Sequence, residues 1–91
     1  NKDAFVLDVR ESSELNQGTI KDSKHINFSS VQTSLDSIKK YSSRPTIVYC
    51  KSGARSATIS NILSKNNFNE VYSIKGGFEA WVSDNLPVVK S

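Results

Sequence analysis

Short apolar runs of strand length alternate with segments of helical pattern along this chain, and that alternation leaves few folds open. The strand-like runs lie at residues 4–9, 25–28, 46–49 and 70–73. The first run is almost continuously apolar, which is typical of a strand buried on both faces of a sheet. Strands that alternate with helices across short loops predict an α/β sandwich, with a central, mainly parallel sheet and helices on both of its faces.

The segments between these runs predict three helices and one short polar element. The helices are expected at residues 34–41, 56–66 and 78–82, the first two because their apolar side chains recur at helical spacing. The polar element lies at 14–17, where Ser12 or Ser13 is expected to cap its start and Gly18 to end it. No repeat or low-complexity segment interrupts this order.

Composition and charge narrow the function classes. Ninety-one residues, 36% of them hydrophobic and 23% charged, suit one domain over residues 1–91 and argue against disorder or a membrane span. The net charge is +3, and Lys39-Lys40 is the only pair of adjacent basic residues. We therefore expect no nucleic-acid or membrane partner, and a mild attraction for small anions. The start at Asn1, without an initiator Met, is compatible with a domain that is part of a longer protein.

Cys50 is the only cysteine, so the chain can form no internal disulfide. No Cys or His pair has metal-ligand spacing, and no metal is expected. A lone thiol is most simply placed in a reducing compartment, which predicts a cytoplasmic location. Cys50 stands where the strand at 46–49 ends, and ligands of parallel α/β sheets bind beyond the carboxyl ends of the strands. Asp8-Val9-Arg10 and Gly76-Gly77 fall at two other such ends.

The residues after Cys50 are suited to stabilising a thiolate, the form of cysteine that acts as a nucleophile. Backbone N–H groups between a strand and a helix can form a cradle, and Gly53 suits one because such backbone often needs positive φ. The dipole of the following helix and the charges of Lys51 and Arg55 add positive potential. Ser56 is expected to cap that helix. A buried structural cysteine is the alternative, but these polar neighbours would line an apolar slot poorly.

At this point the sequence resembles the rhodanese-like domains, sulfurtransferases that carry sulfur as a cysteine persulfide. "LDVRESSEL" resembles the family's Asp-Val-Arg strand end, and "GTIKDSKHINF" is similar to the segment that follows it. "IVYCKSGARSATISNILSKNNFNEVYSIKGGFEAW" closely resembles the active-site loop, its helix and the closing Gly-Gly-x-x-x-Trp. The resemblance covers nearly the whole chain, and the motifs occur in the family's order and spacing.

Three positions depart from the family pattern. Thr19 stands where the family usually has His, Asp22 where Gly or Asn is common, and Asn27 where Pro usually follows Ile26. We also expect the strand or helix that usually opens the domain to be absent from residues 1–91. These departures lie outside the Cys50 loop, so they affect the expected loop conformation and leave the catalytic assignment unchanged.

The length of the loop separates two related activities. Protein tyrosine phosphatases and the rhodanese-related dual-specificity phosphatases use Cys-x5-Arg, whereas Cys50 and Arg55 here form Cys-x4-Arg. The shorter cradle leaves less room for phosphate and suits a persulfide. The mercaptopyruvate branch has a Cys-Gly-x-Gly-Val-Thr type of loop, whereas the cations Lys51 and Arg55 resemble the thiosulfate type. Lys51 stands in place of a common Arg and supplies charge without a bidentate fork.

The resemblance implies a double displacement without a cofactor. Cys50 takes sulfane sulfur from a small anionic donor such as thiosulfate and passes it to a thiol or a protein cysteine. The implied donor-binding residues are those of the loop: Lys51, Ser52, Gly53, Ala54, Arg55 and Ser56. Two alternatives stay open. One is a sulfur-relay or recognition module of a larger protein with little activity on free thiosulfate. The other is a phosphatase or arsenate reductase of the same fold.

The remaining polar and aromatic candidates are expected to be structural. Asp8 and Arg10 are predicted to anchor loop backbone at the end of the sheet, and His25 is not expected to act as a general base. Phe78 and Trp81, three residues apart, are expected in the core or in a pocket wall. Gly76-Gly77 is predicted to be a strand-to-helix turn, and Lys39-Lys40 to be solvated surface.

Overall fold

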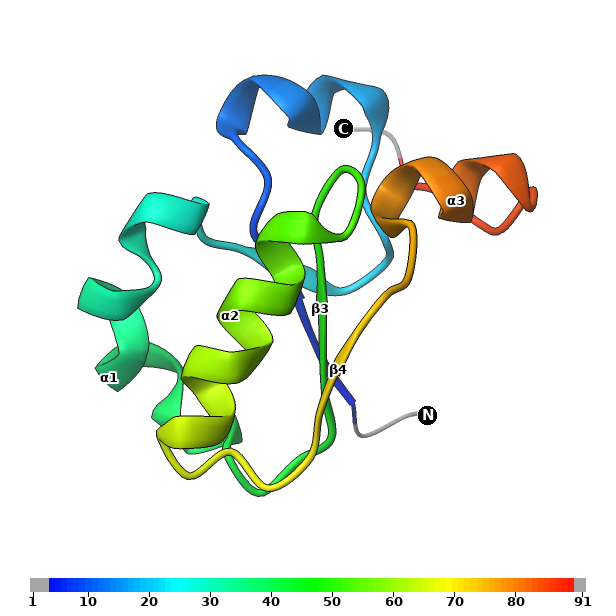
Figure 1. The fold of residues 1–91 in the computed structure, drawn as a ribbon. Coiled ribbons are helices and arrows are strands. Elements are labelled where there is room, and N and C mark those ends of the chain that lie inside the picture. Colours follow the sequence, from blue (N-terminus) through cyan, green and yellow to red (C-terminus); the bar gives the residue numbers. More distant parts are fainter. Residues whose placement is uncertain (1–3, 90–91) are drawn as a thin grey trace.

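A four-stranded parallel sheet forms the centre of the computed structural model, which describes residues 4–89. The strands are β1 (Phe5–Asp8), β2 (Ser23–His25), β3 (Thr46–Tyr49) and β4 (Val71–Ser73). Their order across the sheet is β2-β1-β3-β4, and all three pairings are parallel. The predicted α/β class with a parallel sheet is therefore confirmed (Figure 1).

Two helices cover one face of the sheet. Phe5 pairs with Thr46 and Leu7 with Val48, so these four side chains share that face. Above it lie α1 (Leu35–Ile38) and α2 (Ala54–Lys65), both on the same side of the strands in Figure 1. The larger core forms between them from buried apolar side chains: Phe5, Leu7, Val9, Val31, Ile38, Val48, Cys50, Ile59, Leu63 and Phe68. This burial fixes α2 directly behind the Cys50 loop.

The opposite face is covered mainly near the carboxyl ends of the strands. There α3 (Gly77–Ser83) places Phe78 against Tyr49 and Ile20 in a second, smaller core. Farther along the same face, Tyr72 pairs with Ile47 in the sheet and is 55% exposed. The second layer is thus concentrated at the end of the sheet where Cys50 lies.

Three predicted strand and helix boundaries are corrected by the structure. β2 ends at His25, and the strand predicted at 25–28 gives way to the 3-10 turn η2 (Phe28–Ser30). The helix predicted at 34–41 is divided into η3 (Gln32–Ser34), α1 and η4 (Lys39–Tyr41). The Ser37 hydroxyl donates to the Ser34 carbonyl, 2.7 Å away, and such bonds compete with a continuous helix. α2 begins two residues before its predicted start, because Gly53 rather than Ser56 precedes its first turn.

The polar element becomes the 3-10 helix η1 (Ser12–Gln17), and its start is also corrected. Neither Ser12 nor Ser13 caps it. Instead, the Glu11 N–H donates to the Glu14 carboxylate, 2.8 Å away. Gly18 follows it with φ +105°, so the predicted end is confirmed.

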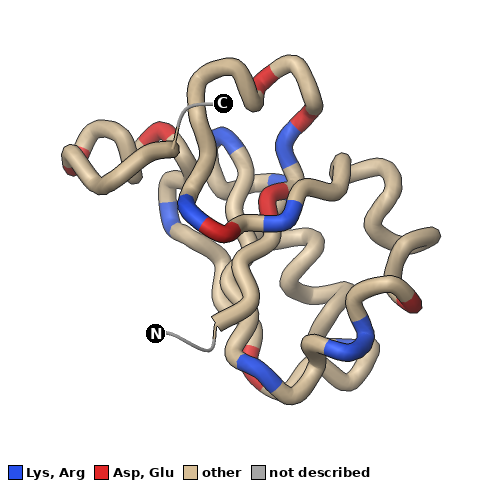
Figure 2. Tube along the Cα trace, turned by 180° about the vertical axis from the view of Figure 1, so that it is seen from behind, with Lys and Arg blue, Asp and Glu red and all other residues tan. Residues whose placement is uncertain are grey.

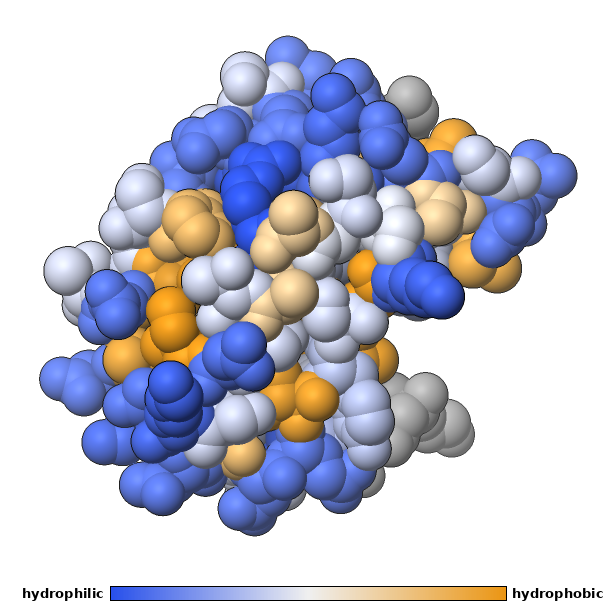
Figure 3. Space-filling model, viewed as in Figure 1, coloured by the Kyte–Doolittle hydropathy of each residue, from blue (hydrophilic) through white to orange (hydrophobic). Residues whose placement is uncertain are grey.

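Within residues 4–89, no long run of one charge occurs along the chain. Residues of both signs are interspersed along the chain in Figure 2. On the face drawn in Figure 3, hydrophobic residues reach the surface in groups between hydrophilic ones, for example over α3. None of the helices within residues 4–89 is long and apolar enough to cross a membrane.

Candidate active site

The Cys50 sulfur lies at the centre of a ring of hydrogen-bond donors. The backbone N–H of Gly53 donates to Sγ at 3.1 Å and that of Ser56 at 3.4 Å. The Ser56 hydroxyl oxygen lies 3.7 Å from Sγ. Cys50 itself is 0% exposed, so the sulfur sits beneath the loop and not on its surface. A buried sulfur surrounded by donors differs from an apolar structural cysteine, because the donors favour its anion.

Two opposing effects set the acidity of this thiol. Burial raises the pKa of Cys50, since it penalises the thiolate. Hydrogen bonds from Ser56 and from the N–H groups of Gly53 and Ser52 outweigh burial, and the pKa of Cys50 falls below its ordinary value. These hydrogen bonds, rather than the charges of Lys51 and Arg55, are the leading causes that lower the pKa.

Gly53 and Ser56 are held by α2, which begins immediately after the loop. Gly53 has φ +107°, a backbone conformation that residues with a side chain rarely adopt. Its carbonyl accepts a hydrogen bond from the Ala57 N–H. Ser56 lies in the first turn of α2, so it is not the cap. Its hydroxyl donates to the Gly53 carbonyl at 3.0 Å and lies 2.6 Å from the Ser73 hydroxyl of β4. The loop is therefore fixed from the helix and from the sheet.

The turn before α3 supports the loop from the other side. The Phe78 N–H donates to the Cys50 carbonyl at 2.7 Å, and the Glu79 N–H donates to that of Lys51 at 3.0 Å. Gly77 has φ +61°, and a Cβ added there would lie 2.5 Å from the Cys50 carbonyl oxygen. Gly76-Gly77 is thus the predicted turn, and its lack of side chains also lets the backbone approach the loop.

Arg55 forms an ion pair with Glu14, a residue for which the sequence predicts no role. Its two terminal nitrogens donate to the two carboxylate oxygens of Glu14, at 3.1 and 3.3 Å. The side chains are partly buried, at 29% and 20% exposure. Hydrogen bonding to Glu14 raises the pKa of Arg55. Burial of Glu14 opposes its ionisation, but Arg55 and the Glu11 N–H lower the pKa of Glu14 overall. No periodic pattern could reveal this pair, which spans 41 positions of the chain.

The other predicted loop residues lie on the outside of the loop. Lys51, Ser52 and Ala54 are exposed. Ser52 contributes through its backbone N–H, as described above for the thiol. The structure therefore brings Gly53, Arg55 and Ser56 towards Cys50, and it leaves the Lys51 side chain in solvent.

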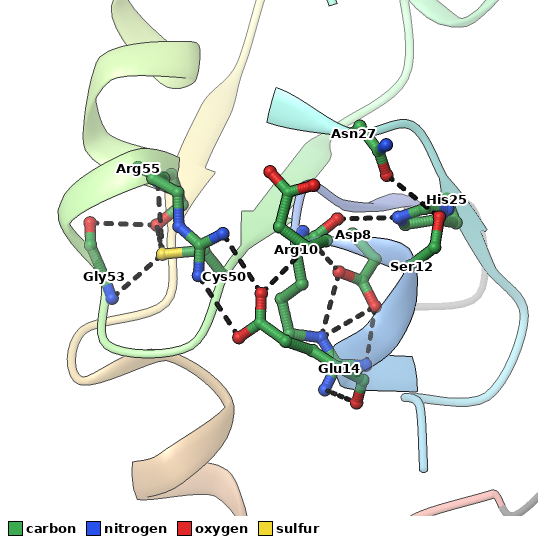
Figure 4. Close-up of polar contacts among 11 residues, drawn as sticks. Asp8, Arg10, Ser12, Glu14, His25, Asn27, Cys50, Gly53 and Arg55 are labelled. Atoms are coloured by element: carbon green, nitrogen blue, oxygen red, sulfur yellow. Dashed lines mark hydrogen bonds and ion pairs between the residues drawn. The ribbon is translucent and has the colours of Figure 1, made fainter. Parts of the chain in front are cut away.

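Asp8 and Arg10 form a buried ion pair next to the site. They are 0% and 1% exposed, and the Arg10 Nη2 lies 2.8 Å from Asp8 Oδ2. The same guanidinium donates to the Gly18 carbonyl at 2.7 Å and to the Glu14 carbonyl at 3.3 Å. It also lies over the Phe78 ring, 4.2 Å from the centroid. These contacts support the predicted anchoring role, and they place η1 beside the Cys50 loop (Figure 4).

His25 and Trp81 each contact a backbone carbonyl group. The His25 Nε2 lies 2.7 Å from the Arg10 carbonyl oxygen, a contact with backbone that is visible in Figure 4. The Trp81 indole N–H donates to the Pro87 carbonyl at 2.6 Å, and its ring packs against the smaller core. Both contacts are structural.

A family comparison agrees with this geometry. The model of the family described as "Rhodanese-like domain" matches residues 1–84. The chain belongs to the rhodanese-like domain family. A thiosulfate sulfurtransferase GlpE of Glaesserella parasuis is 33% identical to this rhodanese-like domain over 88 residues, which are 97% of the chain and 80% of that protein. A protein of Allochromatium vinosum named sulfurtransferase is 31% identical, with the same coverage.

Solved structures show the same fold. A rhodanese-related protein of Thermoplasma volcanium superposes on this rhodanese-like domain with a TM-score of 0.90 and 32% identity, covering 99% of the chain and 87% of that structure. A Rhodopseudomonas palustris protein described as a possible tyrosine phosphatase gives a TM-score of 0.85 at 24% identity, covering 94% of the chain and 70% of that structure. The second likeness concerns the fold alone.

Proposed function

We propose that this rhodanese-like domain is a sulfurtransferase that carries sulfane sulfur on Cys50. The observation that carries the proposal is the set of N–H donors around Sγ, which stabilises the thiolate and lowers the pKa of Cys50. The thiolate attacks the outer sulfur of thiosulfate, a sulfur–sulfur bond breaks, and sulfite leaves with the bonding electron pair. The product is a Cys50 persulfide anion, so charge and atoms balance without a cofactor.

The second half of the cycle returns the thiolate. A thiophilic acceptor, such as a thiol, a protein cysteine or cyanide, attacks the outer sulfur of the persulfide, and the Cys50 thiolate is the leaving group. The same amides that stabilise the thiolate would then stabilise it as a leaving group. Both halves thus use one preorganised anion site, and ping-pong kinetics are expected.

Loop length favours sulfur over phosphate. Only four residues separate Cys50 from Arg55. The relatives named sulfurtransferase support the same choice. We propose a reducing, cytoplasmic setting, since the chain's one cysteine must remain free to react.

Intact-mass spectrometry tests the proposal. After incubation with thiosulfate, the domain is expected to gain the mass of one sulfur atom and to lose it again when cyanide is added. Cys50→Ser should gain nothing, because it lacks the acceptor sulfur.

The same samples distinguish the alternatives. An unmodified wild-type domain that hydrolyses p-nitrophenyl phosphate would contradict the proposal in favour of a phosphatase. A domain that accepts sulfur from a protein persulfide but not from free thiosulfate would instead indicate a relay module.

A further inference from the structure

The guanidinium nearest the sulfur already has an anionic partner. Glu14 holds both terminal nitrogens of Arg55 in a bidentate pair. The carboxylate is itself held in place: it accepts from the Glu11 N–H, and the Glu14 carbonyl accepts from the buried Arg10. This pair is therefore part of the architecture that joins η1 to the loop.

The same nitrogens are the ones that an anionic donor would use. In Figure 4 the Arg55 guanidinium lies between Cys50 and Glu14, and Cys50 contributes to the charge environment of Arg55. A sulfonate or carboxylate binds a guanidinium through the same fork geometry that Glu14 now occupies. A second anion cannot use the Nη1–Nη2 edge while Glu14 holds it. Cys50 itself is 0% exposed.

We propose that Glu14 is a specificity-determining residue, whose carboxylate competes with anionic sulfur donors for Arg55. An entering dianion exchanges with Glu14 for the guanidinium, whereas an uncharged reagent needs no such exchange. Glu14 thus weakens the reaction of Cys50 with anions relative to neutral molecules. The identity of the donor rests on the proposed function, but the charge selectivity at the sulfur does not.

Two alkylating reagents that differ in charge measure this selectivity directly. Iodoacetate is an anion and iodoacetamide is neutral, and the Cys50 thiolate displaces iodide from both. The ratio of their second-order rate constants isolates the effect of reagent charge, because the thiolate fraction and the access to sulfur are common to both. Cys50 is the only cysteine, so the alkylated mass reports one site.

Glu14→Gln is the informative variant. Its amide oxygen can still accept from the Glu11 N–H, so the start of η1 is retained while the charge is removed. We expect the ratio of the iodoacetate rate constant to the iodoacetamide rate constant to rise about three- to tenfold. This range corresponds to the free energy of one partly exposed charge pair. Asp36→Asn, an exposed change of the same net charge on α1, should leave the ratio unchanged. Circular dichroism confirms that both variants fold.

Opposite outcomes overturn the proposal. A Glu14→Gln ratio equal to that of Asp36→Asn would show that Glu14 does not compete. A lower ratio would show that Glu14 instead presents Arg55 to anions.

Sulfur transfer from thiosulfate is measured separately on the same variants. If the proposed function holds, Glu14→Gln should lower the KM for thiosulfate about three- to tenfold, in parallel with the alkylation ratio. If no variant transfers sulfur while the ratio rises as expected, the sulfurtransferase assignment fails and the role of Glu14 stands. If transfer occurs but neither the ratio nor KM moves, the role of Glu14 fails alone.

Discussion

At the scale of single residues, Ser56 donates its N–H to the Cys50 sulfur and places its hydroxyl oxygen 3.7 Å from Sγ. Its hydrogen bonds are the largest of the effects that lower the pKa of Cys50. A thiol whose pKa is depressed reacts above that pKa and loses reactivity as the pH falls through it. The midpoint of the rate of iodoacetamide modification against pH should therefore lie below the value of about 8.5 for a free cysteine.

Ser56→Ala should raise that midpoint by roughly half to one pH unit, because it removes the hydroxyl that lies beside Sγ and can turn its hydrogen to the sulfur once the thiolate forms. Ser60 offers a matched control one turn farther along α2, since its buried hydroxyl has no hydrogen-bond partner among the described residues. Ser60→Ala should leave the midpoint unchanged. Equal midpoints in wild type and Ser56→Ala would show that the backbone amides alone stabilise the thiolate.

At the scale of elements, the site depends on a contact between the α3 turn and the Cys50 loop. A Cβ at position 77 would lie 2.5 and 2.6 Å from the carbonyl oxygens of Cys50 and Lys51. Gly77→Ala should therefore displace the loop, destabilise the fold by about 1–3 kcal/mol and raise the pKa of Cys50. Thermal unfolding and the iodoacetamide profile measure the two effects.

Gly76→Ala separates backbone strain from displacement of the loop. Gly76 also has positive φ, at +78°, but its added Cβ would meet the Ala80 side chain 2.7 Å away. This variant should lose stability while keeping the Cys50 profile of the wild type. If Gly76→Ala changed the iodoacetamide profile of Cys50 as much as Gly77→Ala does, strain in the turn, and not the contact of Gly77 with the loop, would affect the thiol.

The elements also show which parts of the site the sequence predicts. β3 and the Cys50 loop were predictable because an apolar run ends directly at a thiol followed by polar residues. The start of α2 was predicted two residues too late, because Ser is in general a better N-cap than Gly. In the structure the Ser56 hydroxyl instead contacts Gly53 and Ser73. Glu14 was missed because polar residues on a short 3-10 helix carry no periodic signal. Only the folded arrangement brings it to Arg55.

At the scale of the whole molecule, Arg10 connects the parts that surround the site. It pairs with Asp8 at the end of β1, binds the carbonyls of Glu14 and Gly18 around η1, and packs on Phe78 of α3. The sheet end and both covering elements therefore share one buried cation. Burial penalises the charge of Arg10, but the hydrogen bonds and charge of Asp8 raise the pKa of Arg10 overall.

Removing Asp8 should consequently destabilise the domain far more than removing Glu14. Asp8→Ala leaves the Arg10 guanidinium buried without a counter-charge, and the expected loss is about 3–5 kcal/mol of unfolding free energy. Glu14→Ala breaks a pair whose members remain partly exposed, and it should cost about 1 kcal/mol or less. Urea unfolding followed by the fluorescence of Trp81, the only tryptophan, measures both variants. Equal losses of unfolding free energy in the two variants would mean that η1 is held mainly by its contact with the Cys50 loop. A much larger loss for Asp8→Ala would establish the buried pair as the connection between the sheet and the elements that form the site.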